Sequence, residues 1–266
     1  MRWSLIILTY DAEATIERCL HSIARVFDGE ELEVLIHDNG SRDATVERLR
    51  RISESGVLPL RLYLSPRNQG TTVPRNRLAR LSRGEFLIVL DADTELVQLP
   101  PVELAERLRA EPLTLIAPEL RLGDGSVQDS VRPFPTVGDK LRRAWGIVAR
   151  AAPLTADRYH LPRQDALDVD CAMAACWVLT RQLWERVGEL DERIFYSPED
   201  LDWCLRCWRA GGRIRYDPRY RVNHFAQKLS HRRVFSRVNL RHASGLAYYF
   251  AKHRHAWRRP RGASDA

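Results

Sequence analysis

The chain lacks any long apolar run. Of its 266 residues 44% are hydrophobic, enough for a buried core in one large domain or two small ones. The longest apolar stretches, such as 5–8 and 86–90, nevertheless stay below the roughly 20 residues of a membrane-spanning helix. The chain also opens directly on a strand-like run, without the pattern of a cleavable signal peptide. These absences predict a cytoplasmic protein.

Cysteine is scarce and odd in number, with five in the chain. A chain of this length needs no disulfide scaffold, so we expect reduced thiols. Cys204 and Cys207 have the spacing of a zinc motif, but they fall inside a predicted helix between two tryptophans. That setting favours buried thiols over zinc ligands.

Acidic residues are almost missing from the C-terminus. Residues 228–266 hold ten Lys or Arg and one acidic residue, a net charge of +9, so the first 227 residues contribute −2 to the total of +7. Such a tail suits nucleic acid, a membrane surface or another anionic ligand. The body of the chain shows no basic patch, so we do not expect nucleic-acid binding.

Short apolar strands alternate with helices in the first half of the chain. Predicted strands cover 2–9, 32–36, 60–64, 86–90 and 113–117, and predicted helices cover 12–26, 43–53, 71–81 and 102–110. This order predicts βαβ units and an α/β fold with a mostly parallel central sheet. Ligands of such sheets bind beyond the carboxyl ends of the strands.

The second half has a less regular pattern. Residues 121–168 read as an insertion or acceptor-side segment with a helical stretch at 141–152, and 172–187 reads as helical or mixed. A helix is predicted at 197–210, capped by Ser197, with Pro198 in its first turn and two glycines at its end. Short strands at 213–216 and 220–223 and a helix at 230–255 complete the prediction.

The sharpest motif is Asp91-Ala92-Asp93, after the fourth strand. Residues two apart in an extended segment point to the same side, and two carboxylates there form a hard-oxygen site for Mg²⁺ or Mn²⁺. The alternative is a turn with a helix cap, but the position after the fourth βα unit favours a metal. His224 is the candidate third ligand, the alternative being a hydrogen-bonded structural histidine.

Polar residues follow the other strands as well. Asp38 could accept a hydrogen bond from a nucleobase, or residues 38–41 could be a turn with Ser41 or Asp43 capping the next helix. Arg75 could pair with a phosphate or be a solvated helix charge. Three further loop residues are counted as candidates for ligand binding: Thr9, Tyr10 and Asn68.

A second acidic cluster lies at 199–202. Asp200, with Glu199 beside it, is a candidate general base for a hydroxyl. Ser197 and Asp200 also have the spacing of a capping box, and a helix N-terminus would lower the basicity of the carboxylate. The spacing of Ser197 and Asp200 alone favours the capping box over the general base. Tyr196 and Trp203 are predicted to stack on sugars, and Trp177 and Trp184 to pack in the core.

Taken in order, these residues resemble the family 2 glycosyltransferases. The resemblance covers about residues 3–224 and is carried by ordered motifs: 8–13, 37–43, 67–70 with Arg75-Asn76, 91–93, 187–192, 198–202 and 220–224. Within the family the chain is most similar to rhamnosyltransferase-like members, which share the Glu-Asp-x-Asp helix and a basic, aromatic C-terminal helix. Many of these relatives carry a looser version of Asp-Ala-Asp, and this departure leaves the donor sugar open.

The resemblance implies a single GT-A-type, Rossmann-like domain, a nucleotide-diphosphate-sugar donor, a divalent metal and inversion at the anomeric carbon. It places Thr9, Asp38 and Arg75 in the nucleotide region. It also matches three groups to roles: Asp91 and Asp93 to the metal and diphosphate motif, His224 to a metal ligand of some relatives, and Asp200 to the base. That match favours the role of Asp200 as a general base over its role as a capping-box residue.

The predicted function is inverting, metal-dependent transfer of a sugar to a hydroxyl of a glycan or lipid-linked acceptor, as a rhamnosyltransferase of cell-surface polysaccharide synthesis. Residues 1–227 would form the catalytic domain, with a nucleotide-sugar-binding half at 1–118 and an acceptor-side half at 119–227. The basic amphipathic helix and tail at 228–266 would touch an anionic membrane at its inner face, or the apolar side of the helix would pack on the catalytic domain with its charges facing water.

Two other classes stay open. A nucleotidyltransferase that makes the activated sugar would need a glycine-rich phosphate loop after the first strand, and residues 9–13 contain no glycine. A non-catalytic protein that binds sugars or nucleotides would not need the carboxylates at 91, 93 and 200. A turnover assay separates it from an enzyme.

Overall fold

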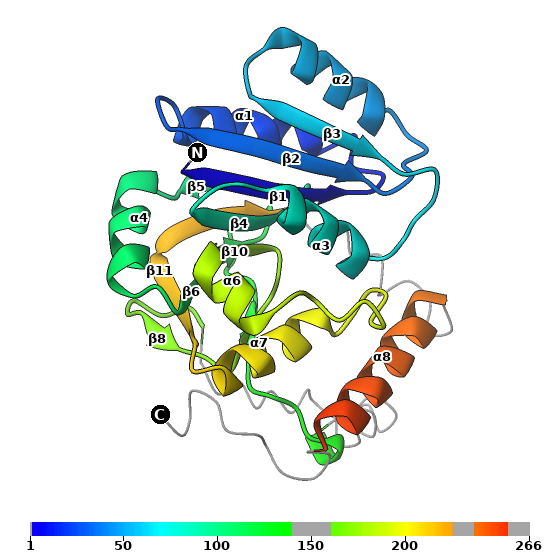
Figure 1. Ribbon diagram of the computed structural model, residues 1–266, viewed down its shortest axis with the longest axis vertical. Helices are drawn as coiled ribbons and strands as arrows, with labels where there is room; N and C mark the ends of the chain where they lie inside the picture. The colour runs from blue at the N-terminus through cyan, green and yellow to red at the C-terminus, as the bar shows by residue number, and fades with distance from the viewer. Residues whose placement is uncertain (1, 140–160, 226–236, 255–266) are drawn as a thin grey trace.

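A nine-stranded β-sheet forms the centre of the molecule in a computed structural model that describes residues 2–139, 161–225 and 237–254 (Figure 1). The strand order is β3-β2-β1-β4-β10-β6-β11-β5, and β8 pairs with β11 beside this path. The strands are β1 (Trp3–Thr9), β2 (Leu32–Asp38), β3 (Leu60–Leu64), β4 (Phe86–Asp91), β5 (Thr94–Gln98), β6 (Thr114–Arg121), β8 (Leu167–Asp168), β10 (Cys176–Thr180) and β11 (Arg213–His224). Strands β5, β8 and β10 run against the others. The predicted α/β fold with a mostly parallel sheet is confirmed.

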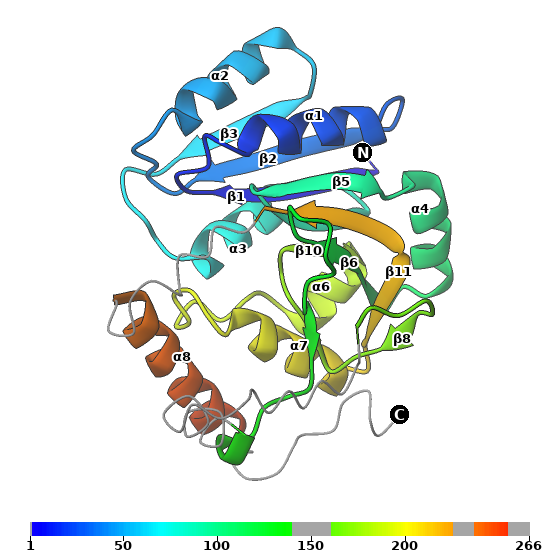
Figure 2. The same ribbon diagram turned by 180° about the vertical axis from the view of Figure 1, so that it is seen from behind.

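Helices cover both faces of the sheet (Figures 1 and 2). One face packs on α1 (Ile16–Val26), α2 (Thr45–Ser55) and α4 (Pro101–Ala110). The other packs on α3 (Thr72–Leu81), α6 (Arg181–Val187) and α7 (Glu199–Arg209), and α8 (Arg237–His253) lies beside α7 and packs against the same cluster. A two-stranded antiparallel sheet of β7 (Val131–Arg132) and β9 (Cys171–Ala172) lies beside the main sheet. This two-layer cover is what strands that are apolar on both sides require.

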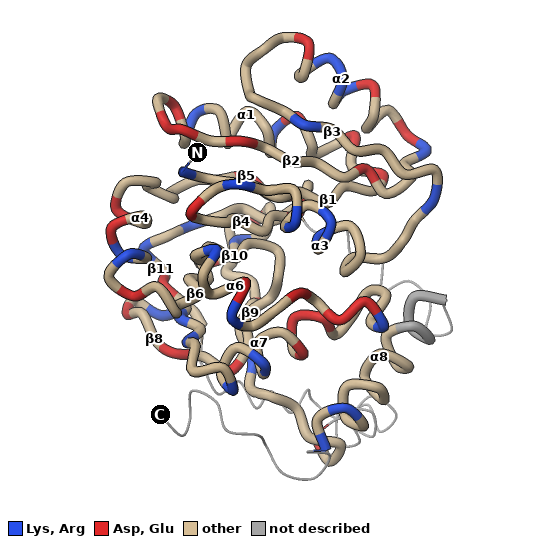
Figure 3. The backbone as a smooth tube through the Cα atoms, in the orientation of Figure 1, with Lys and Arg blue, Asp and Glu red and all other residues tan. Residues whose placement is uncertain are grey.

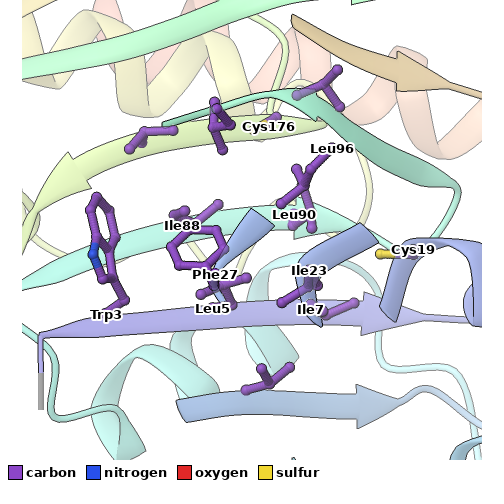
Figure 4. Packing of buried hydrophobic residues seen from close by; sticks show 14 of the residues in the cluster. Trp3, Leu5, Ile7, Cys19, Ile23, Phe27, Ile88, Leu90, Leu96 and Cys176 are labelled. Atoms are coloured by element: carbon purple, nitrogen blue, oxygen red, sulfur yellow. The ribbon is translucent and has the colours of Figure 1, made fainter. Parts of the chain in front are cut away.

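The alternation of side chains along β1 explains the two cores. Leu5 and Ile7 point into the cluster under α1, while Ile6 points into the cluster under α3. Figure 4 shows the first cluster, where Ile23 and Phe27 of α1 lie over the strand residues. These positions have helical spacing, so one stripe of α1 is buried and the opposite stripe meets water.

Besides the two-residue strands β7, β8 and β9, two longer strands were not predicted. β10 lies in a segment expected to be helical or mixed, and it is an entirely buried antiparallel strand between β4 and β6. A short apolar run has no period that separates a buried strand from a helix. β5 is a five-residue strand on the sheet edge, between the acidic motif and α4. The two strands predicted at 213–223 are one strand, β11, with an irregularity between Asp217 and Arg221.

The predicted boundaries in the second half need smaller changes. α7 begins at Glu199 with Pro198 as its N-cap residue, so Ser197 is not the cap. The expected division at residue 118 falls inside β6, and β10 and β11 of the second half join the same sheet as the first half. The helical stretch expected at 141–152 lies outside the described residues. Within the described parts of the chain, no helix combines the length and apolarity needed to cross a bilayer.

All five cysteines fall in the described parts of the chain, and all are buried and free. Cys204 and Cys207 are fully buried in α7, in the cluster that packs against the sheet. They are core residues, in agreement with the expectation of buried thiols.

Candidate active site

Two neighbouring elements build an acidic cluster with one histidine. β4 ends at Asp91, and the turn into β5 presents Asp93. Antiparallel pairing of β5 with β11 sets His224 opposite Thr94, and the backbone N–H of Phe225 donates to the carbonyl of Asp93 at 2.7 Å. The potential ligand atoms of Asp91, Asp93 and His224 consequently lie within 4.8 Å of one another.

The ring of His224 is held in one orientation. Its Nδ1 lies 2.7 Å from Oε1 of Gln128, and its Nε2 lies 3.3 Å from Oδ1 of Asp93. An amide oxygen only accepts, so Nδ1 carries the hydrogen of this bond and Nε2 faces the carboxylates. Burial opposes protonation, but the hydrogen bond to Asp93 and the charges of Asp93 and Asp91 raise the pKa of His224.

The donor set of this cluster fits a divalent cation. Two carboxylates and an imidazole suit Mn²⁺, and the carboxylates suit Mg²⁺. A cation would take the place that a proton on Nε2 otherwise fills, because metal binding requires a neutral imidazole. Asp91, Asp93 and His224 are therefore the residues that would hold a metal.

Arg75 connects this cluster to α7. Its side chain, on α3, is almost fully buried at 3% exposed. One guanidinium nitrogen lies 2.5 Å from Oδ1 of Asp91, and the other lies 3.0 Å from Oε1 of Glu199. This arrangement excludes the solvated helix charge considered for Arg75. Its guanidinium group contacts two carboxylates, so a direct contact of Arg75 with a phosphate stays a prediction.

Glu199 is a buried carboxyl with a perturbed acidity. Burial is the largest influence, and the nearby charge of Asp200 adds to it, while Arg75 acts in the opposite direction. Together these three influences raise the pKa of Glu199 to about 7. This group therefore exists in both protonation states near neutral pH, as suits a proton-transfer residue.

Asp200 does not act as a capping-box residue. Its Oδ2 forms an ion pair with Arg132, and its Oδ1 accepts the backbone N–H of Leu201 at 2.8 Å. The N-cap residue of α7 is Pro198, and it makes no side-chain capping bond. The capping-box alternative is therefore wrong, and the role of Asp200 as a base stays a prediction. Arg132, whose side chain is 44% exposed, reaches the carboxylate from β7.

The loop after β2 holds Asp38 in a turn. Its carboxylate accepts the backbone N–H groups of Gly40 and Ser41 at 3.1 and 3.0 Å and the hydroxyl of Ser41 at 2.5 Å. Three of its roughly four acceptor positions are thus used locally. The turn interpretation holds for this loop, and recognition of a nucleobase by Asp38 stays a prediction. The N-cap residue of α2 is Ala44, and the backbone N–H of Thr45, the first residue of that helix, donates to Oδ1 of Asp43 at 3.0 Å.

Asn68 supports the next loop in the same way. Its Oδ1 accepts from Asn39 Nδ2 at 3.1 Å and from the backbone N–H of Gly70 at 2.9 Å. Gly70 has φ +85°, and a Cβ there would lie 2.1 Å from the carbonyl oxygen of Phe195, so only glycine fits. This close approach holds the 67–70 loop against the chain that leads into α7.

Thr9 and Tyr10 differ in their accessibility. Thr9 is buried, and its hydroxyl has no hydrogen-bond partner within the described part of the chain. Tyr10 is exposed at the same end of β1. A buried hydroxyl without a partner beside an exposed aromatic ring is compatible with a ligand at this strand end, where both residues were predicted to bind the donor.

The prediction that Trp203 stacks on a sugar is wrong. Trp203 is fully buried, with its ring 5.1 Å from that of Trp177 and 5.8 Å from that of Trp184. It is a core residue because its place on the inner face of α7 points it at the sheet. Tyr196 is 47% exposed and stays a candidate for contact with a sugar.

The C-terminal helix uses its apolar side for packing. Tyr249 is fully buried, and Leu246 and Phe250 pack against the same cluster as α7. Figure 3 shows acidic residues gathered in and just before α7, beside this helix. The described part of α8 therefore packs these apolar side chains on the domain and does not present them to a membrane. Of the two alternatives considered from the sequence, the structure favours packing. The basic segment at 257–261 lies outside the described residues.

Sequence patterns missed two residues of the site. Gln128 and Arg132 come from the segment treated as an insertion, yet they bind His224 and Asp200. Neither has a spacing that signals its role. Only the path of residues 121–132 back to the carboxylates reveals it.

Residues 4–152 match the model of the family described as Glycosyl transferase family 2, more than half of the chain. The chain belongs to this family. It is a glycosyltransferase, as its motifs predicted. Among curated relatives it is similar to the N-acetylglucosaminyl-diphospho-decaprenol L-rhamnosyltransferase of Mycobacterium tuberculosis, with 27% identity over 96% of this chain and 86% of that protein.

Solved structures of other glycosyltransferases share the fold of this family 2 member. The mannosyltransferase PcManGT from Pyrobaculum calidifontis, in complex with GDP-Man and Mn²⁺, has a TM-score of 0.62 and 20% identity. The match covers 97% of this chain and 66% of that one. GalNAc-T7 with UDP, GalNAc and Mn²⁺ has a TM-score of 0.66 and 16% identity, covering 96% of this chain and 52% of that one.

Proposed function

We propose that this glycosyltransferase moves a sugar from a nucleotide-diphosphate-sugar to a hydroxyl of a glycan or lipid-linked acceptor, with inversion at the anomeric carbon. The observation that carries the proposal is the convergence of Asp91, Asp93 and His224 within 4.8 Å at the carboxyl end of β4. Open α/β sheets bind their ligands at this end. Residues 1–118 would form the donor half and 119–227 the acceptor half.

The reaction needs one proton transfer and one displacement. The acceptor hydroxyl gives its proton to the carboxylate of Asp200 while its oxygen attacks the anomeric carbon. The bond from that carbon to the diphosphate breaks, and its electron pair leaves with the diphosphate oxygen. A cation bound by Asp91, Asp93 and His224, either Mg²⁺ or Mn²⁺, would neutralise the charge that develops on the leaving group.

The other residues of the site serve orientation. Gln128 fixes the ring of His224, Arg75 holds Asp91 and Glu199 together, and Arg132 fixes the carboxylate of Asp200. Placing a base within reach of the attacking hydroxyl converts a two-body encounter into a step within one complex, which is a large part of the rate enhancement.

The name of the mycobacterial relative suggests the finer substrate class. That protein is called an N-acetylglucosaminyl-diphospho-decaprenol L-rhamnosyltransferase, and it aligns with nearly the whole chain. We propose a 6-deoxyhexosyl donor and a polyprenyl-diphosphate-linked sugar as acceptor.

A donor screen tests the proposal. The full chain is incubated with Mn²⁺ or Mg²⁺, a polyprenyl-diphosphate-linked N-acetylglucosamine and a panel of UDP-, GDP- and dTDP-sugars, and nucleotide release is measured with and without EDTA. We expect release from one donor class, loss of release in EDTA and recovery with added cation. Full turnover in EDTA would contradict the metal site, and no turnover with any donor would contradict catalysis.

A further inference from the structure

We propose that helix α8 positions the carboxylates at the start of α7, through a backbone contact at Gly245 and a buried ion-pair cluster around Asp202. The proposal rests on the function proposed above, because Glu199 and Asp200 are the carboxylates assigned to proton transfer. Both views of the molecule show α8 beside the loop that leads into α7 (Figures 1 and 2).

The first contact is between two backbones. A Cβ atom on Gly245 would lie 2.3 Å from the carbonyl oxygen of Ser197 and 3.2 Å from Cδ of Pro198. Pro198 is the N-cap residue of α7, so the contact is one residue before Glu199. Because neither backbone can yield as a side chain does, the position of α8 at Gly245 fixes where the first turn of α7 begins.

The second contact is a cluster of charges one turn along α7 and two turns along α8. Asp202 is fully buried and lies 2.6 Å from Nζ of Lys252, 2.8 Å from Nε2 of His253 and 2.9 Å from Nε of Arg206. Burial would raise the pKa of Asp202, but these partners outweigh it and lower the pKa to about 2. The backbone N–H of Asp202 also donates to the carbonyl of Pro198 at 3.2 Å.

Lys252 extends the cluster toward the chain that precedes α7. Its ammonium group lies 2.8 Å from Oδ2 of Asp191, and the hydroxyl of Tyr248 donates to the same oxygen at 2.8 Å. Lys252 therefore joins Asp191 and Asp202, which lie on either side of the two catalytic carboxylates in the sequence. Its replacement would leave buried negative charge without its main partner.

The residues of α8 that make these contacts share one buried face with its apolar side chains. Gly245, Tyr249 and His253 are buried and are four residues apart, so they lie on one face of the helix. Ala247 lies on the exposed side. A helix that was only appended to the surface would not need a glycine at the centre of its buried face, where glycine lowers helix propensity.

The substitution Gly245→Ala separates positioning from simple stability. Alanine raises the intrinsic helix propensity, but its Cβ forces α8 away from Ser197. We expect turnover to fall between about 10-fold and 10²-fold, the usual cost of misplacing a catalytic group by ~1 Å. The donor KM should stay within about twofold, since the lost interaction concerns the transition state. The control is Ala247→Ser, which also adds one heavy atom to α8 but on its exposed side, and it should behave as wild type.

Two further measurements exclude an effect of reduced folded fraction. The acidic limb of the pH profile of turnover should move to higher pH in Gly245→Ala, because a displaced α7 loses its contacts with Arg75 and Arg132. A smaller folded fraction would lower the profile without moving it. The substitution Lys252→Met, near the C-terminal end of α8, should move the acidic limb of the pH profile in the same direction. It serves as the test variant if Gly245→Ala fails to fold.

Hydrogen exchange tests the positioning without any assay of activity. The amides of residues 199–203 should exchange faster in Gly245→Ala than in Ala247→Ser, since their first turn loses its support. Equal exchange together with wild-type turnover would overturn the proposal. A wild-type protein that turns over no donor would instead refute the proposed function, and the exchange comparison would still decide whether α8 supports α7.

Discussion

Replacing Arg75 by methionine should destabilise the protein strongly and in a pH-dependent way. The guanidinium is 3% exposed and lies between Asp91 and Glu199, so its removal leaves two carboxylates without their shared partner. Breaking a buried ion pair costs about 3–5 kcal/mol. Asp91 is 32% exposed and can be hydrated, so most of this cost arises at Glu199, which is buried. For a chain of this size the melting temperature should fall on the order of 10 °C.

The sign of the pH dependence follows from Glu199. Its pKa is about 7 in the folded protein, above the ordinary value of 4.5 for a glutamate, and loss of Arg75 raises it further. A raised carboxyl pKa means that the folded state holds a proton that the unfolded state has released. Stability therefore decreases as the pH rises from about 4.5 through the folded pKa. The destabilisation by Arg75→Met should accordingly be small near pH 5 and larger at pH 8.

Chemical denaturation at both pH values measures this effect, with two matched variants. Arg77→Met changes an exposed arginine on the same helix and should cost less than about 1 kcal/mol. Glu199→Gln combined with Arg75→Met should recover part of the stability, because it removes the unpaired charge. The reasoning would be refuted by equal losses in the two arginine variants, or by a double variant no more stable than Arg75→Met alone.

Three other outcomes are expected. Asp200→Asn should reduce turnover at least ~10²-fold with donor binding retained, and a change confined to the melting temperature would restore the capping interpretation. Asp93→Ala should weaken Mn²⁺ binding more than Asp91→Ala, because Asp91 also pairs with Arg75; calorimetric titration measures this, and equal effects would count against that pairing. Lys252→Met should lower stability by an amount that is full above about pH 4 and shrinks as the pH falls through about 2, below which Asp202 is protonated in both states. Acid titration of both proteins checks this, and a constant difference would be inconsistent with the ion pair.

Much of the sheet could be predicted because its first half repeats one unit. The strands that contain Ile6, Leu35 and Val89 each have an apolar centre and are separated by helices with clear spacing, so both the parallel sheet and its polar edge follow. Asp91 and Asp93 could be found for the same reason, since the motif directly follows a recognisable strand.

The remainder depends on contacts between distant residues. His224 was a candidate ligand from the sequence, but its place beside Asp93 could not be derived, because it depends on the pairing of β5, a short edge strand without a distinct pattern, with β11. Arg132 comes beside Asp200 from a segment without helical or strand periodicity. The burial of Trp203 depends on which face of α7 meets the sheet, which spacing near a helix start does not define.

The pairing of β5 with β11 has a consequence for how the protein acquires a metal. Asp91 and Asp93 belong to a turn that forms locally, whereas His224 arrives only when the last strand has joined the sheet edge. An unfolded or half-folded chain therefore offers two carboxylates but not the complete set of ligands. A cation that prefers the complete set binds the folded chain alone and stabilises it in proportion to the logarithm of its concentration. The melting temperature at increasing Mn²⁺ thus reports whether the last strand is in place.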